Sequence, residues 1–418
     1  MLLTMIGLAV GLGNVWRFPY MMGSYGGSAF LLTYLGFTLL LAVPALSAEW
    51  ALGRATGAGP PDAYRRVFGN RFGWLLGGTL LVTVLVADSY YLVVIGQILI
   101  TAVWSLGPGF GDGQLAAFRS TLGNGALQFG VAAGLLGLSL WIIDRGVRRG
   151  IEAASRWIVP GFVVVMAYLI AVALNLPGAG TALAGFLRPD FGALDAGDVF
   201  AALGQAFFSL GLGGTFHVVY GSYLKHSTPL VENAALAALG DISAALLASL
   251  FIVPVALVFA LDLAQGPSLI FDTLPRLFAR MPGGGWPGGL FLLALTAVAL
   301  LSNIAALEVA RAALARRWPD HRRAIIASLL GIELLLIAPV AFDNDLIGIL
   351  DLVFGSGMQL AGGLAAVIAL GWGLGRKRAI AALFGETSPG WGGLYAQWLR
   401  WVVPLVLLAV LTGWFFQR

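Results

Sequence analysis

Long apolar runs recur along the whole chain, and they limit its possible folds more than any other feature. Most are about 20 residues long, the length that an α-helix needs to cross the hydrocarbon core of a membrane. Only 11% of the 418 residues are charged and 59% are hydrophobic, whereas soluble proteins carry about 25% charged residues. The sequence therefore predicts an all-α polytopic membrane protein with about 11 transmembrane helices.

The positively charged side chains predict how these helices are oriented. Most of the 24 lysine and arginine residues fall on one side of the expected spans, and the exceptions are Arg17, Arg119, Arg188, Arg276, Arg280 and Arg418. Positive charge accumulates on the cytoplasmic side of a membrane. We therefore expect a multi-pass protein of a bacterial-type cytoplasmic (inner) membrane, in contact with the lipid bilayer, with its N-terminus inside and its C-terminus outside.

Two classes of function are disfavoured by the composition. The basic residues are spread loop by loop and do not indicate a nucleic-acid surface. The chain has no cysteine, which excludes disulfides and thiolate metal sites, and its three histidines show no HExxH spacing. A GxSxG serine motif is also missing from the sequence. The sequence does not indicate an enzyme, and it makes no prediction of the oligomeric state.

The first apolar run, from Gly7 to Pro19, is built as a poor helix. Three of its residues are glycines, each of which costs about 1 kcal/mol relative to alanine in a helix. A break inside a membrane must be satisfied by protein or a polar cavity, and it offers carbonyl oxygens to a cation and amides to an anion. Asn14 adds a side-chain oxygen and Arg17 a permanent charge. A glycine-rich packing helix is the alternative.

A second glycine cluster, from Gly204 to Thr215, interrupts the apolar run five helices later. Two broken helices at corresponding places in two halves of a chain are typical of inverted-repeat transporters. We therefore expect one transmembrane domain over residues 1–418, with a first repeat at about 1–175, a second at about 198–378 and an extra helix at about 396–416. Chance clustering of glycines explains either break alone better than it explains both.

Glycine, proline and charged residues divide the remaining runs into individual spans. The expected ranges are 27–53 for the second span, 72–106 for the third, 231–261 for the seventh and 400–416 for the last. The fourth span is expected to end near Asp144 and the eighth at 311–317. The fifth is expected to start after 148–157 and the sixth near Asp198, and a turn at 343–345 should separate the ninth from the tenth. The segment from Pro275 to Pro287 is interpreted as an outer loop that dips into a vestibule.

Several motifs together resemble the neurotransmitter:sodium symporter family. They are GLAVGLGNVWRFPY in the first span, EWALGR at the end of the second, SYY in the third, and GQAFFSLGLGG followed by YGSY in the sixth. The resemblance covers essentially the whole chain. It implies the leucine-transporter-type 5+5 inverted repeat with helices 1 and 6 broken, an amino acid substrate, and sodium-coupled import by alternating access.

The resemblance implies a first sodium site and, in a weaker form, a second. The first would use the carbonyl of Ala9 with Asn14, Ser209 and Asp241, completed by the substrate carboxylate. The negative charge of Asp241 makes a chloride requirement less expected, although Tyr34, Gln205 and Ser209 are of the type found at the family's anion site.

The second sodium site would use carbonyls of Gly7, Val10 and Val298 and the hydroxyl of Ser302. Leu301 stands where the family usually has a further oxygen ligand. Either this site is weak or Asn303 compensates, so one or two sodium ions are expected.

The resemblance also implies where the substrate binds. The carboxylate would meet the amides at Leu12 and Gly13 and the hydroxyl of Tyr91, and the amino group would meet carbonyls near Ala9, Phe208 and Ser209. The remaining walls would be Leu8, Ala87, Asp88, Gly211, Gly214, Ser302 and Ala306. Because Ala87, Gly214 and Ala306 are small, we expect a large hydrophobic or aromatic amino acid.

Asp88 departs from the small residue expected at its position. It lies three residues before Tyr91, so both side chains can face one side of the helix. A carboxyl group there could bind a cationic part of the substrate, could titrate and couple protons, or could be a protonated group in the core. These three readings stay open.

Arg17 and Asp351 resemble the family's outer gate pair, whereas the inner gate does not carry over. The family's N-terminal arginine would precede Met1, and Arg316 occupies its usual acidic position. We therefore expect that the native N-terminus is missing. The alternatives to a sodium symporter are a sodium-independent or proton-coupled exchanger of amino acids or amines, or a substrate sensor, on the same scaffold.

Overall fold

The computed structural model describes residues 11–111, 113–146, 150–261, 263, 269–281, 283–385 and 388–416. Within these ranges all regular secondary structure is helical. Nine of the helices described there are long and apolar enough to cross a membrane: Ser28–Thr56 (α3, η2 and α4), Phe72–Leu106 (α6), Gly125–Asp144 (α8), Glu152–Leu174 (α9), Leu230–Val258 (α13), Gly285–Arg317 (α15), Arg322–Phe342 (α16), Asp345–Gly373 (α17, η6, α18 and η7) and Gly392–Gly413 (in α20, η8 and α21).

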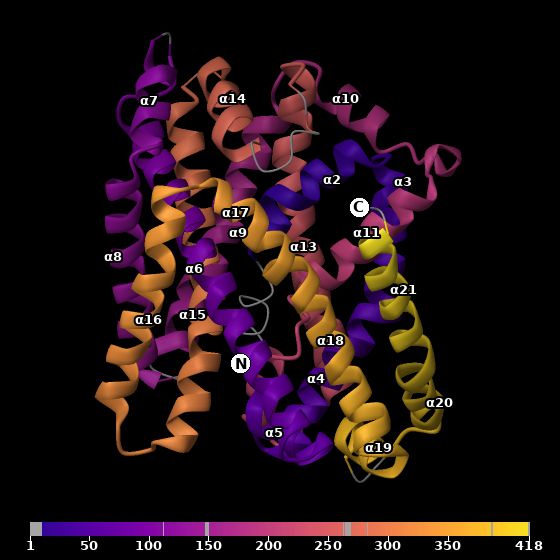
Figure 1. The fold of residues 1–418 in the computed structure, drawn as a ribbon. Coiled ribbons are helices and arrows are strands. Elements are labelled where there is room, and N and C mark those ends of the chain that lie inside the picture. The colour runs from indigo at the N-terminus through magenta and orange to yellow at the C-terminus, as the bar shows by residue number, and fades with distance from the viewer. Residues whose placement is uncertain are drawn as a thin grey trace.

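Shorter helices lie at the two ends of this bundle (Figure 1). One end carries α7 (Gln114–Leu122), α10 (Ala179–Phe186) and α14 (Leu274–Arg280), and we call it the α7 end. The opposite end carries α5 (Pro60–Phe68) and α19 (Arg376–Phe384), and we call it the α5 end.

The predicted break in the sixth span is confirmed. Helix α11 (Ala196–Ser209) ends inside the bundle, residues 210–215 are not helical, and α12 (Phe216–Ser222) continues the span. Asp195 and Asp198 form a capping box that fixes the start of α11. In the first span, Gly11 is a bend, followed by η1 (Gly13–Arg17) and α2 (Phe18–Ser24).

Four predicted site residues of the first span, namely Gly7, Leu8, Ala9 and Val10, lie outside the described residues. The predicted bounds of the third span and the end of the fourth match α6 and α8. The second span extends three residues further, to Thr56, and the seventh ends earlier, at Val258.

Two predictions of the loops and of the last span were wrong. The segment from Pro275 to Pro287 is not a loop but contains most of α14 and the start of α15, because both prolines lie in a first helical turn, where no backbone donor is needed. The last span begins at Gly392 rather than near Arg400. Arg400 can lie inside it because its guanidinium lies 4.4 Å from the centre of the Trp372 ring.

Two apolar cores flank the interrupted helices. One is formed largely by α6, α8, α9, α15 and α16. The other is formed largely by α2, α3, α4, α11, α18 and α21. Helix α13 contributes residues to both cores, and η1 packs against it. The broken segments therefore lie where two separately packed bodies meet, which is where a solute site can form between them.

Candidate substrate and ion site

A polar cluster joins four helices around the fully buried Asp241 of α13. Its Oδ2 accepts hydrogen bonds from the Ser209 hydroxyl at 2.7 Å and from the Tyr34 hydroxyl at 3.3 Å. The side-chain nitrogen of Asn14 donates to the Asp241 carbonyl oxygen at 3.1 Å, to Oδ1 of the same residue, and to Ser209 Oγ at 3.2 Å. Three residues predicted for the first sodium site are thus in mutual contact.

The chemistry of this cluster suits a hard monovalent cation. It offers one carboxylate together with neutral amide, hydroxyl and carbonyl oxygens, which are the ligands that hard cations prefer. In the described part of the chain, no three histidine, cysteine or carboxylate side chains come together as a transition-metal site would require. The Asn14 Oδ1 atom accepts from the Gly11 amide at 2.8 Å, so the same side chain also holds the backbone before η1.

The break in the sixth span is held from the neighbouring helices. Glu49 of α4 accepts a hydrogen bond from the Gly213 amide at 3.0 Å, and the Tyr64 hydroxyl of α5 donates to the Gly214 carbonyl at 3.0 Å. At Gly214 φ is +65°, and a Cβ atom there would lie 2.3 Å from the Tyr64 hydroxyl, so only glycine fits. These partners satisfy backbone groups that the missing helical turn leaves free.

His217 secures the other side of the break. The Trp50 indole can only donate, and it lies 3.2 Å from His217 Nδ1. Nδ1 is therefore the acceptor, and Nε2 carries the hydrogen that it donates to the Leu210 carbonyl at 2.7 Å. His217 is 3% exposed, and its position identifies it as a brace for the break.

A cavity of about 930 Å³ lies next to the Asp241 cluster. Its wall includes most of the predicted substrate residues: Leu12, Gly13, Ala87, Asp88, Tyr91, Phe208, Ser209, Gly211, Ser302 and Ala306. Gly214 does not line it, because it faces Tyr64 and Gly362 instead. The Leu12 amide donates to the Tyr91 hydroxyl at 3.3 Å, so the two polar groups predicted to meet a carboxylate are side by side.

The cavity extends toward the α7 end. Arg119 and Asp272, which form an exposed ion pair at 2.8 Å, line it, as does Asp345 at the start of α17. None of the described residues of α5 or α19 lines the cavity. The substrate residues are therefore reached from the α7 end in this conformation.

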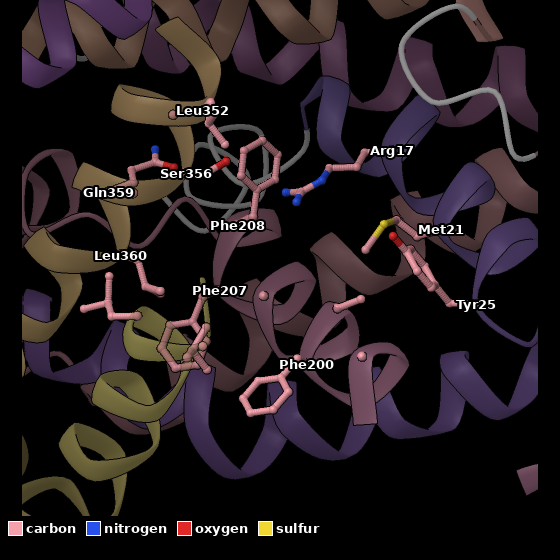
Figure 2. A pocket seen from close by; sticks show the side chains of 18 of the residues that line it. Arg17, Met21, Tyr25, Phe200, Phe207, Phe208, Leu352, Ser356, Gln359 and Leu360 are labelled. Atoms are coloured by element: carbon pink, nitrogen blue, oxygen red, sulfur yellow. The ribbon is translucent and has the colours of Figure 1, made fainter. Parts of the chain in front are cut away.

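The predicted gate pair is not formed. Asp351 accepts a hydrogen bond from the Tyr90 hydroxyl at 3.0 Å, and the guanidinium of Arg17 lies 4.0 Å from the centre of the Phe208 ring (Figure 2). The ion pairs among the described residues do not include Arg17 with Asp351. In this conformation each partner contacts an aromatic neighbour instead, and the role of the two residues as an outer gate stays a prediction.

A second cavity of about 500 Å³ lies on the other side of Phe208. Its walls come from α2, α11, η6 (Asp351–Met358), α18 (Gln359–Ile368) and the C-terminal helix α21 (Val403–Phe416). Figure 2 shows Phe207, Phe208 and Arg17 around this space. Phe208 lines both cavities, so its ring forms part of the partition between them.

The second predicted sodium site is less complete. Ser302 lines the main cavity, and Val298 is fully buried on the same helix. Leu301 is fully buried in the apolar core formed by α6, α8, α9, α15 and α16. The Asn303 amide is used by Asp88 and Ser139, so it does not replace the oxygen that Leu301 lacks.

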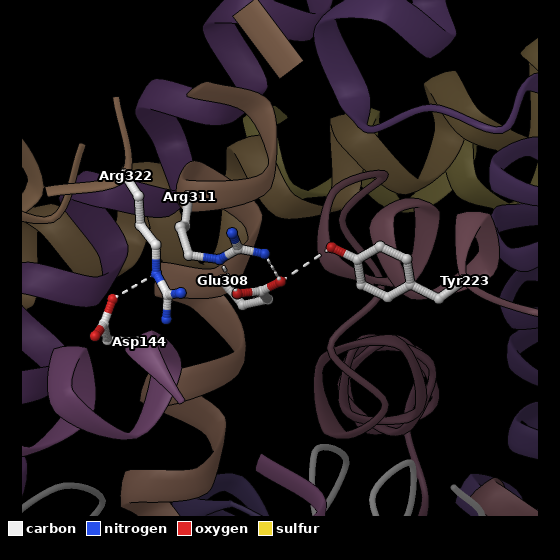
Figure 3. A network of polar contacts seen from close by, with 5 residues as sticks. All are labelled: Asp144, Tyr223, Glu308, Arg311 and Arg322. Atoms are coloured by element: carbon white, nitrogen blue, oxygen red, sulfur yellow. Dashed lines mark hydrogen bonds and ion pairs between the residues drawn. The ribbon is translucent and has the colours of Figure 1, made fainter. Parts of the chain in front are cut away.

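A charged network at the α5 end was missed by the sequence analysis (Figure 3). Glu308 accepts two hydrogen bonds of 2.6 Å from Arg311, three residues later on α15, and a third of 2.9 Å from the Tyr223 hydroxyl next to α12. Glu308 is 1% exposed. The spacing of Glu308 and Arg311 is a signal of such a pair in a helix. Arg316 donates to the Gly57 carbonyl.

The comparisons with known proteins agree over nearly the whole chain. The model of the Sodium:neurotransmitter symporter family matches residues 1–108 and 114–417. The uncharacterized sodium-dependent transporter YhdH of Bacillus subtilis is 31% identical over 97% of this chain and 93% of its own length. The sodium-dependent serotonin transporter of Drosophila melanogaster is 27% identical over 79% of this chain and 61% of its own.

A solved structure is similar throughout. The crystal structure of MhsT in complex with L-phenylalanine has a TM-score of 0.86 and 30% sequence identity, and the match covers 98% of this chain and 96% of that one.

Proposed function

The chain belongs to the sodium:neurotransmitter symporter family and is a multi-pass membrane transporter rather than an enzyme, and we propose that it imports an amino acid by sodium-coupled alternating access. The fold is the all-helical leucine-transporter type. We further propose that the α5 end faces the cytoplasm of a bacterial-type cell, because the basic loops gather there.

The Asp241 cluster carries the ion part of this proposal. Asn14, Ser209 and Asp241 lie within hydrogen-bonding distance of one another in the dry interior. A sodium ion among them would take their oxygens as ligands, with the substrate carboxylate and the Ala9 carbonyl completing the set. Two hydroxyls, those of Tyr34 and Ser209, already donate to Asp241. This built-in negative charge supports sodium use without chloride.

The main cavity carries the substrate part. Its polar groups gather near Leu12 and Tyr91, while Ala87, Ala305 and Ala306 leave space for a side chain. Such an arrangement, with a few polar groups in a mostly apolar pocket, suits a zwitterion with a large hydrophobic or aromatic side chain. That the similar MhsT was crystallised with L-phenylalanine supports the same class of substrate here.

A second sodium ion is proposed as the weaker partner. Val298 and Ser302 on α15 would supply oxygens together with the carbonyls of Gly7 and Val10. Leu301 contributes none, and a cation that loses a ligand in a dry site is bound less tightly. We therefore propose one firmly bound ion and, at most, one weaker ion.

A binding screen of the natural amino acids, with sodium and with potassium in its place, tests the proposal. We expect tight binding of one or a few large hydrophobic amino acids in sodium only. Asp241→Leu should weaken that binding by a hundred-fold or more, on the order of 3 kcal/mol, because the proposed ion site loses its one charged side chain. Glu232→Gln, an acid in the first turn of the same helix, is the matched control.

Two results would contradict the proposal. Equal binding in sodium and in potassium would favour the sodium-independent exchanger or sensor, for which the incomplete second site is the supporting observation. Undiminished sodium dependence in Asp241→Leu would show that the Asp241 cluster is not the ion site.

A further inference from the structure

A second group of buried polar side chains lies on the opposite wall of the main cavity. Asp88 of α6 lines the cavity and is 3% exposed. The side-chain nitrogen of Asn303, on α15, donates to both of its carboxylate oxygens at 2.8 Å. An ionised Asp88 satisfies this arrangement, because both of its oxygens are acceptors.

Glu333 lies behind Asp88 on α16. It is fully buried, and neither of its carboxylate oxygens has a hydrogen-bond partner among the residues that the structure describes. It is close enough to Asp88 for the two groups to interact electrostatically. An ionised carboxylate without any donor is very costly in a dry interior, so Glu333 is neutral. The region behind Asp88 is therefore one in which a carboxyl group holds its proton.

Ser139 and Asn303 form a relay that can serve Asp88 in either protonation state. In the observed arrangement the Ser139 hydroxyl donates to Asn303 Oδ1 at 2.5 Å, and the Asn303 nitrogen donates to Asp88. If Asp88 gains a proton, a flip of the Asn303 amide lets Oδ1 accept from the Asp88 hydroxyl while the nitrogen donates to Ser139 Oγ. Both states keep Asn303 hydrogen-bonded to Asp88 and to Ser139, because an amide has a donor and an acceptor and a hydroxyl can act as either.

We propose that Asp88 and the Asn303–Ser139 relay form a proton-binding site, at which Asp88 takes up a proton when the substrate enters the cavity. The Asp88 carboxylate gains an O–H bond, and the proton comes from water in the open cavity. The site would couple one proton to transport in addition to sodium.

The position of Asp88 links the proton to the substrate, and this step depends on the proposed function. Asp88 lies three residues before Tyr91 on the same helix, and the substrate carboxylate is proposed to bind at Tyr91. Asp88 and the Tyr91 side chain are close enough to interact electrostatically, so a carboxylate bound at Tyr91 would repel an ionised Asp88 in a medium of low dielectric constant. Arrival of the substrate carboxylate therefore favours the protonated form of Asp88.

Few other titratable groups face this site. Tyr91 on α6 and Glu333 on α16 interact electrostatically with Asp88. Helices α15 and α8 present the neutral Asn303 and Ser139. The coupling is therefore governed by Asp88, with the other groups keeping their charge state.

The test is the pH dependence of L-phenylalanine binding in saturating sodium. In the wild-type protein the affinity should fall as the pH rises from about 5.5 to about 8.5, by up to roughly ten-fold per pH unit within the titration range. Asp88→Asn mimics the protonated acid and should abolish this slope. Glu333→Met is the matched control: it replaces a neutral group in the same cluster and should keep the slope.

A second measurement needs no variant. Adding L-phenylalanine to the wild-type protein in weakly buffered sodium solution with a pH indicator should raise the pH, by uptake of up to about one proton per substrate bound. A pH-independent affinity, a slope that survives in Asp88→Asn, or proton release on binding would overturn this inference while leaving sodium symport intact. Absence of sodium-dependent amino acid binding at every pH would overturn both proposals.

Discussion

The α7 end and the α5 end of the central helices are held in different ways. At the α7 end, Arg17 and Asp351 each contact an aromatic neighbour rather than one another, and Asp351 lines the main cavity, which extends to this end. At the α5 end, α12 packs so closely on α4 that a Cβ atom at Gly221 would lie 2.4 Å from the Trp50 carbonyl oxygen. The cavity at the α7 end is thus lined by side chains that do not pair across it, whereas helices at the α5 end are in close backbone contact.

Under the proposed alternating access, the two ends would change in different ways. Opening the α5 end would break the hydrogen bond from Tyr223 to Glu308, and the close backbone contact of α12 with α4 would oppose any movement between these two helices. Closing the α7 end requires only that side chains already lining the cavity change partners. We therefore expect substitutions at the α5 end to have larger effects on conformation than those at the α7 end.

Gly221→Ala should have the largest effect. The added methyl group has no space beside Trp50, so α12 must move away from α4, at a cost of about 1–3 kcal/mol. Gly78→Ala on α6, where nothing lies within 4 Å of the added Cβ, is the matched control and should be neutral or stabilising by up to about 1 kcal/mol. Thermal unfolding in detergent measures both. Equal melting temperatures for the two variants would refute the close backbone contact.

Tyr223→Phe should have the next largest effect. It removes the hydrogen bond from the Tyr223 hydroxyl, next to α12, to Glu308 on α15. A hydrogen bond to a charged group contributes about 1.5 kcal/mol, so its loss should raise the population with an open α5 end roughly ten-fold. The chain has no cysteine, so a cysteine introduced by Ser222→Cys is the single site for maleimide labelling, and its labelling rate reports opening. Labelling should be faster in the variant that carries both Ser222→Cys and Tyr223→Phe than in the variant that carries Ser222→Cys.

Asp144→Ala is the control for the loss of the Tyr223–Glu308 hydrogen bond. It breaks the Asp144–Arg322 ion pair, which is also drawn in Figure 3 but is about half exposed at both partners. Exposed pairs contribute little to stability, so labelling should change less than two-fold, corresponding to under about 0.5 kcal/mol. Equal labelling rates in the Tyr223→Phe and Asp144→Ala backgrounds would contradict the claim that the Tyr223–Glu308 hydrogen bond keeps the α5 end closed.

Asp351→Asn at the α7 end should have a smaller effect on stability than the two substitutions in α12 and next to it. The asparagine can still accept the Tyr90 hydrogen bond, and no ion pair with Arg17 is lost in this conformation. The melting temperature should therefore change by the equivalent of less than about 1 kcal/mol. Its cost should appear instead in the rate of transport, because a closed α7 end would lack the charge that attracts Arg17. A large loss of thermal stability would show that the open end is held by this carboxylate.

Much of this arrangement could be predicted from the sequence. The clustered glycines of the sixth span break the helix because they lower its helical propensity locally, and Asn14, Ser209 and Asp241 do meet, because motifs with fixed spacing bring particular helix faces together. The fourth member of the cluster, Tyr34, also came from the motif comparison.

The remaining features depend on tertiary contacts that no local pattern specifies. Helix α14 was interpreted as a loop because prolines and glycines suggest turns, although a proline in a first turn is compatible with a helix. Gly214 faces Tyr64 because the break turns its backbone away from the cavity. The pairing of Asp88 with Asn303, and the lack of a partner for Glu333, depend on how α6, α15 and α16 pack.

The most direct test of sodium-coupled amino acid import is accumulation in proteoliposomes, with L-phenylalanine as the first probe and the other natural amino acids in the same assay. We predict that an imposed inward sodium gradient drives accumulation above the external concentration, and that Asp241→Leu abolishes it. Exchange at equal rates with or without sodium, and no accumulation of any amino acid, would contradict the claim that the two broken helices bind ion and substrate together.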